Sequence, residues 1–326
     1  MNSTKFVSVA TAAILSMAAF PANAASLTAM QILEQFNGVV WNNFTTQDDV
    51  EGRLVAYNVN GGATFYNNPN PAAAASSFQA LNAINLNNCQ SCNLDNGASA
   101  NWVSTLGGNV HFNYNGGGKL LHSVPTFAIS DFTTPLNAFV AGLTSLGSTH
   151  ALDTIDASDH NQVKFEVSPD SRGVAVFQLT DAQLASFAGI NFTGLTSAQT
   201  TIVDVISTGS DSFTQNFNDL TSNTTYENEH VIWNFENEKT INIRYLHGSL
   251  LGEDASVTNG SPIEGMLYAE NFTGGGELHN FPFLGVDPIG SPIAPGVPEP
   301  ATWALLGMGF AGLGFVSRRA RKTVKA

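Results

Sequence analysis

The amino-acid sequence predicts a mainly β protein, with a discontinuous β-solenoid-like domain and packed helices between an N-terminal signal peptide and a C-terminal transmembrane helix. Three observations lead to this prediction. The chain is rich in Asn, Gly, Ser and Thr and only 12% charged, as is typical of β-rich extracellular proteins with many turns. A strand-and-turn pattern near residue 50 returns near residue 263. Each end of the chain holds an apolar stretch beside basic residues.

Residues 1–24 are expected to be a secretory signal peptide. Lys5 supplies the positive start, and residues 6–20 are mostly apolar or small. Ala22 and Ala24 are small residues at the two positions that a signal peptidase reads, so we expect cleavage between Ala24 and Ala25. The alternative is a short buried helix, which does not need these three parts in this order. The mature domain is then expected to span residues 25–290.

Hydrophobic periodicity predicts the elements of that domain in order. Apolar residues at helical spacing predict a helix from about Leu27 to about Gly38, and alternation predicts strands within residues 49–65 that turn at 60–62. The other expected elements are an Ala-rich helix within 69–86, a short strand and then an amphipathic helix within 127–147, strands at 162–167 and 173–179, a helix at 181–187, a strand at 200–207 and short strands from 231 to 268. Between residues 90 and 225 the overall fold stays open.

The internal echo predicts that the first and last parts of the domain are neighbours. Residues 49–62 and 262–275 share an apolar-Glu-Gly-x-Leu start and an Asn-x-x-Gly-Gly end. Such repeats form stacked rungs in solenoids, although strand–turn patterns also resemble one another by chance. Glu51 and Glu264 hold the same place in the echo and could stack on adjacent rungs. Paired carboxylates can perform acid–base catalysis, but a repeated Glu more often caps backbone N–H groups.

The charge balance excludes one class of partner. The whole chain has a formal charge of −14, and residues 25–297 keep six basic against 25 acidic side chains, or about −19. A surface this acidic repels nucleic acid, so we expect no DNA or RNA partner.

Residues 291–326 fall into three parts. A Pro- and Gly-rich linker (291–300) cannot be helical, because its prolines lack N–H donors. An apolar segment (301–317) follows, whose sixteen uncharged residues from Ala301 to Val316 would rise about 24 Å, a little short of the roughly 30 Å hydrocarbon core. The tail (318–326) is basic, and a basic flank stays on the cytoplasmic side of a membrane. Its charges include Arg318, Arg319, Arg321 and Lys322.

This arrangement resembles the PEP-CTERM sorting signal of Gram-negative bacteria. The resemblance rests on Pro298-Glu299-Pro300, the apolar segment and the basic tail. It implies that an exosortase recognises the Pro-Glu-Pro motif and removes the tail of an inner-membrane-tethered intermediate, and that the protein reaches the cell surface or extracellular matrix. It also implies an association with biofilm-forming bacteria. A permanent anchor that is never cut is the alternative.

The domain itself resembles the choice-of-anchor A family of surface proteins. The residues that carry this resemblance are 49–62, 231–235, 241–243, 248–252, 263–265 and 277–283. The family is treated as adhesive and brings no catalytic residues to transfer. It implies interaction with exopolysaccharide or with other surface proteins.

Two further groups of residues are candidates for chemistry. Cys89 and Cys92 are the only cysteines, and in an exported protein a disulfide is the expected state. Asp153, Asp156 and Asp159 are the densest carboxylate cluster and could attract Ca²⁺, but their spacing does not match an EF-hand loop and favours a solvated turn.

Common catalytic motifs are absent from the sequence, which holds no His-Glu-x-x-His, Gly-x-Ser-x-Gly or P-loop lysine. His279 lies in an expected turn, where a structural hydrogen bond is favoured over catalysis. We therefore expect no enzyme and no cofactor, and an adhesive role through Asn-, Thr- and Ser-rich faces. A carbohydrate-active enzyme on a β-helix scaffold and an ice-binding-like protein are the alternatives.

Overall fold

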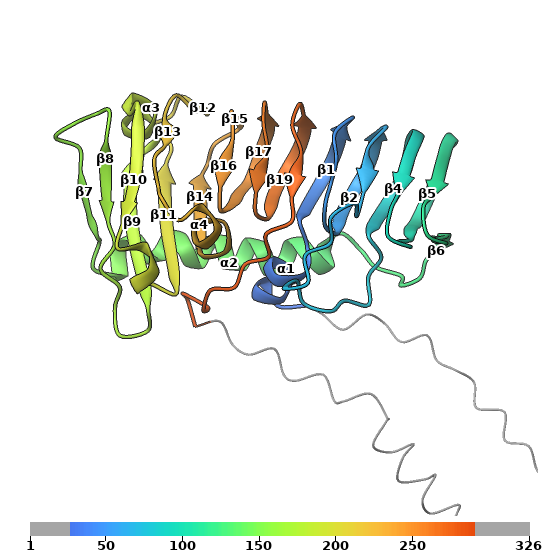
Figure 1. The fold of residues 1–326 in the computed structure, drawn as a ribbon, viewed down its shortest axis with the longest axis horizontal. Coiled ribbons are helices and arrows are strands. Elements are labelled where there is room, and N and C mark those ends of the chain that lie inside the picture. Colours follow the sequence, from blue (N-terminus) through green and yellow to red (C-terminus); the bar gives the residue numbers. More distant parts are fainter. Residues whose placement is uncertain (1–26, 291–326) are drawn as a thin grey trace, which may run out of the picture.

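Parallel strand pairing builds most of the molecule. The computed structural model describes residues 27–290, and there every pair of strands except β7–β8 is parallel. Figure 1 shows the strands side by side in one long row with a single long helix beside it. This is the mainly β, solenoid-like architecture with packed helices that the sequence predicts.

The spatial order of the strands differs from their order in the chain. The main sheet runs β6 (Leu120–His122), β5 (Ala100–Tyr114), β4 (Leu81–Leu94), β2 (Leu54–Gly61), β1 (Gly38–Thr46), β19 (Leu267–Gly274), β17 (Ser249–Asn259), β14 (Val231–Glu236), β11 (Thr200–Ile206) and β9 (Val174–Thr180), with β3 (Thr64–Phe65), β12 (Ser212–Thr214) and β15 (Thr240–Ile243) beside it. Two small sheets complete the coil: β13 (Asn218–Asp219), β10 (Gly189–Thr193), β8 (Val163–Glu166) and β7 (Thr154–Asp156), and β16 (Leu246–His247), β18 (Ile263–Glu264) and β20 (Leu278–His279).

Strand β1 joins the two ends of the domain. Its Asn43 lies opposite Asn58 of β2 on one side and Asn271 of β19 on the other. The predicted neighbourhood of the echo segments is thus confirmed, with one difference: β2 and β19 flank β1 and do not touch. In Figure 1 the blue start of the domain lies directly beside its orange-red end. The coil is discontinuous because late strands complete the row that early strands begin.

Each complete rung has three straight parts. Residues 38–40 of β1 form the part under the long helix, and a register shift between Val40 and Asn43 marks the corner to residues 43–46. The third part holds Val50, which bridges to Phe65 and Leu278. We call these parts the helix side, the ladder side and the third side.

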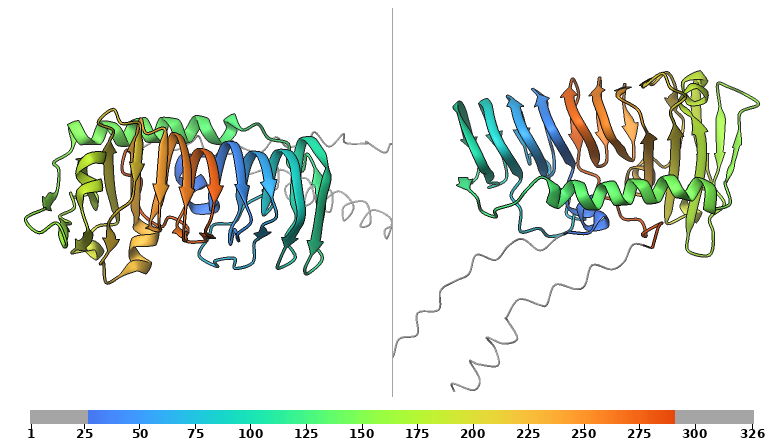
Figure 2. Two further views of the ribbon diagram at one scale, coloured as in Figure 1. Left: turned by 90° about the horizontal axis from the view of Figure 1, so that it is seen from above. Right: turned by 180° about the vertical axis from the view of Figure 1, so that it is seen from behind.

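Helices lie outside the coil. They are α1 (Ala29–Gln35), α2 (Ser130–Thr149), α3 (Asp181–Ser186), α4 (Thr224–His230) and a 3₁₀ turn at Leu195–Ser197. α1 starts where predicted, because Thr28 and Gln31 form a capping box. Figure 2 shows α2 running along the row of strands, and its apolar face packs on outward residues of the helix side such as Val55 and Tyr268.

Two sequence-based predictions are wrong. The Ala-rich helix within 69–86 is absent: residues 71–80 are turns and loops, and Leu81 begins β4. Alanine favours a helix in isolation, but hydrogen bonding of β4 between β2 and β5 outweighs that preference. The short strand expected before the helix of 127–147 is absent too, since α2 starts at Ser130.

The core fills the inside of the coil with columns of side chains, one from each rung. Phe44, Phe272, Val59 and Leu86 form one such column, and each is at most 1% exposed. The Phe44 and Phe272 rings are stacked, with centroids 5.4 Å apart. A second apolar cluster lies between α1, α2 and the helix side. Within residues 27–290 no helix is both long and apolar enough to cross a bilayer.

Candidate functional site

Two rows of small polar side chains cover the ladder side. The first row runs through Ser212, Thr240, Ser256, Asn271, Asn43, Asn58, Asn85 and Thr105. The second row runs through Thr214, Asn242, Thr258, Thr273, Thr45, Asn60, Asn88 and Asn109. These sixteen positions lie on eight adjacent strands and hold only Asn, Ser and Thr. We call the two rows the polar ladder.

Strand geometry produces this surface. Side chains alternate between the two faces of a strand, so Phe44 enters the core while Asn43 and Thr45 point outward. Parallel pairing in register then repeats the alternation from rung to rung. Adjacent strands lie about 4.8 Å apart and successive outward residues of one strand about 7 Å apart. The polar ladder is therefore a regular two-dimensional array.

Side-chain hydrogen bonds tie the first row together. The Nδ2 of Asn58 donates to the Oδ1 of Asn43 at 3.1 Å, and the Nδ2 of Asn43 donates to the Oδ1 of Asn271 at 3.1 Å. Asn271 donates to the hydroxyl of Ser256, and Asn85 donates to Asn58 at 2.9 Å. Each amide keeps further donor and acceptor capacity. The row is thus preorganised and still able to bind polar groups.

A charged cluster occupies the third side. Parallel pairing of β18 with β20 places Glu264 opposite His279, and the bridge from Val50 to Leu278 brings Glu51 close by. The His279 Nε2 lies 2.8 Å from a Glu277 oxygen, and its Nδ1 lies 3.4 Å from Glu264. Glu51 and Glu264 were expected on adjacent rungs, but the structure places His279 between them.

The cluster stabilises its own charges. The hydrogen bond to Glu264, together with the nearby Glu277 and Glu51, raises the pKa of His279 to about 9. The same hydrogen bond lowers the pKa of Glu264. Glu51 accepts the backbone N–H of Asn280 at 2.9 Å, which is the capping role that the sequence favours for this residue. His279 has the predicted hydrogen-bonding role, although its partners are carboxylates.

Metal ligation has one candidate group among residues 27–290. Glu51, Glu277 and His279 each offer an atom within 4.8 Å of the others. The three aspartates singled out in the sequence do not form such a group. Asp153 accepts the N–H of Val176, Asp156 lies 4.0 Å from the Lys164 ammonium, and Asp159 accepts the N–H of Asn161.

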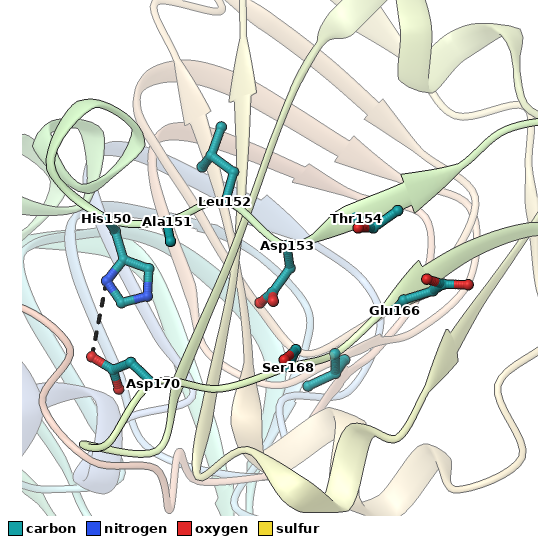
Figure 3. A pocket seen from close by; sticks show the side chains of 9 residues that line it. His150, Ala151, Leu152, Asp153, Thr154, Glu166, Ser168 and Asp170 are labelled. Atoms are coloured by element: carbon teal, nitrogen blue, oxygen red, sulfur yellow. Dashed lines mark ion pairs between the residues drawn. The ribbon is translucent and has the colours of Figure 1, made fainter.

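Asp153 lines a pocket at the end of the coil where β7 and β8 lie. Figure 3 shows its side chain there with Glu166, Asp170 and His150, whose ring is 3.9 Å from Asp170. The pocket measures about 380 Å³. Burial raises the pKa of Asp153, whereas hydrogen bonds from Val174 and Arg172 lower the pKa of Asp170 to about 2. These carboxyl groups already have protein partners.

Three of the four buried carboxyl groups within residues 27–290 have strongly raised pKa values. Asp204 lies under α2 on β11 and accepts hydrogen bonds from Gln178 and Asn234, and burial and Glu236 raise its pKa to about 7. Burial and Asp219 raise the pKa of Glu227 well above its ordinary value. Burial and Asp181 raise the pKa of Glu238 to about 7. No sequence pattern indicated these groups.

The disulfide expected between Cys89 and Cys92 is present in β4. Both cysteines are buried and face the core at the corner between the ladder side and the third side. The predicted cleavage site at Ala22, Ala24 and Ala25, the Pro298-Glu299-Pro300 motif and the basic tail lie outside residues 27–290.

Comparison with known families assigns the domain. Residues 29–280 match the family model described as "Putative Ice-binding-like adhesive domain", which covers more than half of the chain. The chain belongs to this family. The matched residues of this ice-binding-like adhesive domain include both rows of the polar ladder and the His279 cluster.

A second match identifies the sorting signal. Residues 296–322 match the PEP-CTERM protein-sorting motif. The ice-binding-like adhesive domain is therefore carried by an exported cell-surface protein that an exosortase processes, as the sequence predicted.

Two further comparisons add little to the assignment. Among solved structures, an ice-binding protein from the Antarctic ascomycete Antarctomyces psychrotrophicus is similar, with 10% identity, coverage of 78% of this chain and 98% of that chain, and a TM-score of 0.29. No curated protein matches the chain.

Proposed function

We propose that the polar ladder binds hydroxyl-rich polymers, with the exopolysaccharide of the producing cell's own matrix as the partner class. The observation that carries this proposal is the array of sixteen Asn, Ser and Thr positions on eight adjacent strands. Sugar hydroxyls both donate and accept hydrogen bonds, as do amides and hydroxyls of the ladder. The repeat along the ladder suits a polymer, because a chain can make the same contact on several rungs.

The charge of the ladder supports this proposal. The mature chain is strongly acidic, but neither row contains a charged residue. An uncharged strip lets a neutral or weakly acidic polysaccharide approach without desolvating carboxylates.

One substitution on the ladder tests the proposal. Thr273 is exposed at the centre of the second row, and Thr273→Tyr keeps strand propensity while raising a ring above the array. We expect at least about tenfold weaker binding to the producer's polysaccharide, or about 1.4 kcal/mol. Thr134→Tyr on the exposed part of α2 is the matched control and should bind normally. Equal binding by both variants in a sedimentation assay would exclude the ladder as the binding surface.

Ice is a second candidate ligand, because the family description names ice binding and the ladder is regular. Ice recrystallisation assays with the same two variants separate the candidates. Loss of ice activity in Thr273→Tyr, with no polysaccharide binding by the unmodified protein, favours ice.

The role we propose is binding without catalysis. The ladder holds no carboxylate, His or Lys that could act as an acid, a base or a nucleophile. The charged groups of the third side pair with one another. A carbohydrate-active enzyme would instead release reducing ends from the polysaccharide, which a reducing-sugar assay detects.

We also infer how the protein is processed during export and to which surface-protein family its domain belongs. Residues 1–24 are removed as a signal peptide, and residues 301–317 hold an inner-membrane intermediate before the tail is cut near Pro298-Glu299-Pro300. The sequence segments named above support membership of the choice-of-anchor A family within Gram-negative biofilm producers. Mass spectrometry of the protein from its host should show an N-terminus at Ala25 and a C-terminus close to Pro300. A mature chain that still contains Arg318 would show that the tail is a permanent anchor.

A further inference from the structure

The hydrophobic core is open at the β5 end of the coil. Leu106 continues the column of Phe44, Val59 and Leu86, yet Leu106 is 41% exposed while the others are at most 1% exposed. Tyr114 continues the column of Phe65 and Leu94 in the same way and is 40% exposed. In both columns β5 supplies the last side chain, because β6 pairs only with residues 100–102 of β5.

Little of the chain covers this end within residues 27–290. Strand β6 pairs only with residues 100–102 of β5, so residues 104–114 form the edge. The opposite end is closed, because β7 pairs antiparallel with β8 there and α3 lies beside β9. Solenoids usually need a polar cap at each end to stay soluble.

The edge lacks the usual protection against association. Strand β5 contains no Asp, Glu, Lys or Arg, although exposed edges are commonly protected by charges. In a strongly acidic protein this end is therefore a neutral, partly apolar patch, where two like molecules meet with little charge repulsion.

The C-terminal end of the described chain lies far from this patch. Near the end of the described chain, the carbonyl of Pro288 accepts a hydrogen bond from Arg172 and that of Val286 accepts one from Thr200. Both donors lie at the starts of β9 and β11, at the other end of the strand order from β5. Figure 1 shows the last red segment under the β9–β11 end and β5 at the opposite extreme. A molecule attached to a cell surface through its processed C-terminus would present the β5 end outward.

We propose that the β5 end is a docking surface for the β5 end of a second copy of this chain. A two-fold axis would place Leu106 and Tyr114 of each copy against the open core of the other, closing both cores at once. Because the other end of the coil is capped, the contact closes as a dimer and does not grow into a fibre. The last described residues of the two copies would lie at the outer ends of the dimer, so two copies attached through their C-termini would connect two surfaces.

Side chains, more than strand pairing, form this contact. Gly107 and Gly108 form a bulge in β5 relative to β4, where a Cβ at Gly107 would lie 1.9 Å from the Asn87 carbonyl oxygen. A bulge disturbs the row of backbone groups that strand addition needs. The apolar side chains that end the core columns then supply most of the buried surface.

Sedimentation equilibrium of the protein purified from its host tests the proposal. We expect a concentration-dependent dimer for the unmodified protein and at least about tenfold weaker dimerisation for Leu106→Lys. Leu220→Lys, at a 46% exposed position outside this end, is the matched control and should dimerise normally. Thermal unfolding of both variants checks that each remains folded.

Two results would overturn the dimer proposal, and neither depends on polysaccharide binding. A protein that stays monomeric at all concentrations, or a Leu106→Lys variant that dimerises like Leu220→Lys, overturns the proposal. The Thr273→Tyr variant should still dimerise, because its position is away from the β5 end. Polysaccharide binding and dimerisation can therefore fail independently.

Discussion

Replacing Phe44 with alanine is expected to lower the free energy of unfolding by about 3–5 kcal/mol, the range for deleting a fully buried aromatic ring. Phe44 is fully buried and stacks on Phe272 in the middle of the core. It also belongs to β1, which joins the early and late strands. The cavity would therefore lie where the two halves of the coil meet, and a shift of the backbone could not easily fill it. Urea unfolding followed by circular dichroism measures the change.

Tyr57→Ala is the matched control for this prediction. Tyr57 lies on the adjacent strand β2 and is 38% exposed, so its loss should cost less than about 1 kcal/mol. If both variants lose the same stability, the Phe44 column does not hold the two halves together.

The second large effect is a loss of stability as pH rises from 5 to 8. In the folded domain the pKa values of Asp204 and Glu238 are raised to about 7, and burial raises the pKa of Glu227 well above its ordinary value. A carboxyl group with a raised folded pKa binds more protons in the folded than in the unfolded state. Its stabilising contribution is complete below its ordinary pKa, near pH 4, and is lost as pH rises through about 7.

The stability of the folded domain should also decrease at acidic pH. Asp170 has a pKa lowered to about 2, and Glu264 is lowered as well. Their contribution is present above their ordinary pKa values and is lost as pH falls through the lowered ones. We therefore expect the melting temperature to be highest near pH 4 and to fall by several degrees between pH 5 and pH 8, for a change of about 2 kcal/mol.

Neutral variants test the cause of the alkaline loss. Asp204→Asn and Glu227→Gln cannot ionise, so the melting temperature of the double variant should change less between pH 5 and pH 8. Asp131→Asn, at an exposed position of α2, should keep the full pH dependence. A flat profile for the unmodified domain would contradict the assigned pKa shifts.

The sequence predicted the architecture through one feature, the echo. Asn58 and Asn271 hold the same place in the two copies and lie on the same row of the ladder, each next to Asn43. Alternation predicted β8, β9, β11 and the short strands between 231 and 268, but not β10, β12, β13 or β20. Strands β1, β4 and β5 were not predicted. The Ala-rich stretch within 69–86 indicated a helix, but residues 72–75 lie in a loop, and Leu81 begins β4, whose pairing with β2 and β5 overrides the local helix preference.

The candidate sites were harder to predict for the same physical reason. The polar ladder and the His279 cluster exist only after the rungs are stacked in register. The sequence indicated Asn- and Thr-rich faces and gave His279 a hydrogen-bonding role. It could not place Glu264 and Glu51 on either side of that histidine, since their proximity depends on the pairing of β18 with β20 and on the bridge between Val50 and Leu278. Conversely, Asp153, Asp156 and Asp159 are close in sequence but bind separate partners.

The position of β1 between β2 and β19 constrains when the domain can finish folding. Synthesis and export deliver β1 among the first strands and β19 almost the last. Until residue 274 has left the translocation channel, β1 has an unpaired edge and the core around Phe44 is incomplete. Such long-range pairing is slow and leaves apolar surface exposed while it waits. The fold can be completed only when the whole domain has been exported, so a chain interrupted before residue 267 should be degraded by proteases outside the cytoplasm.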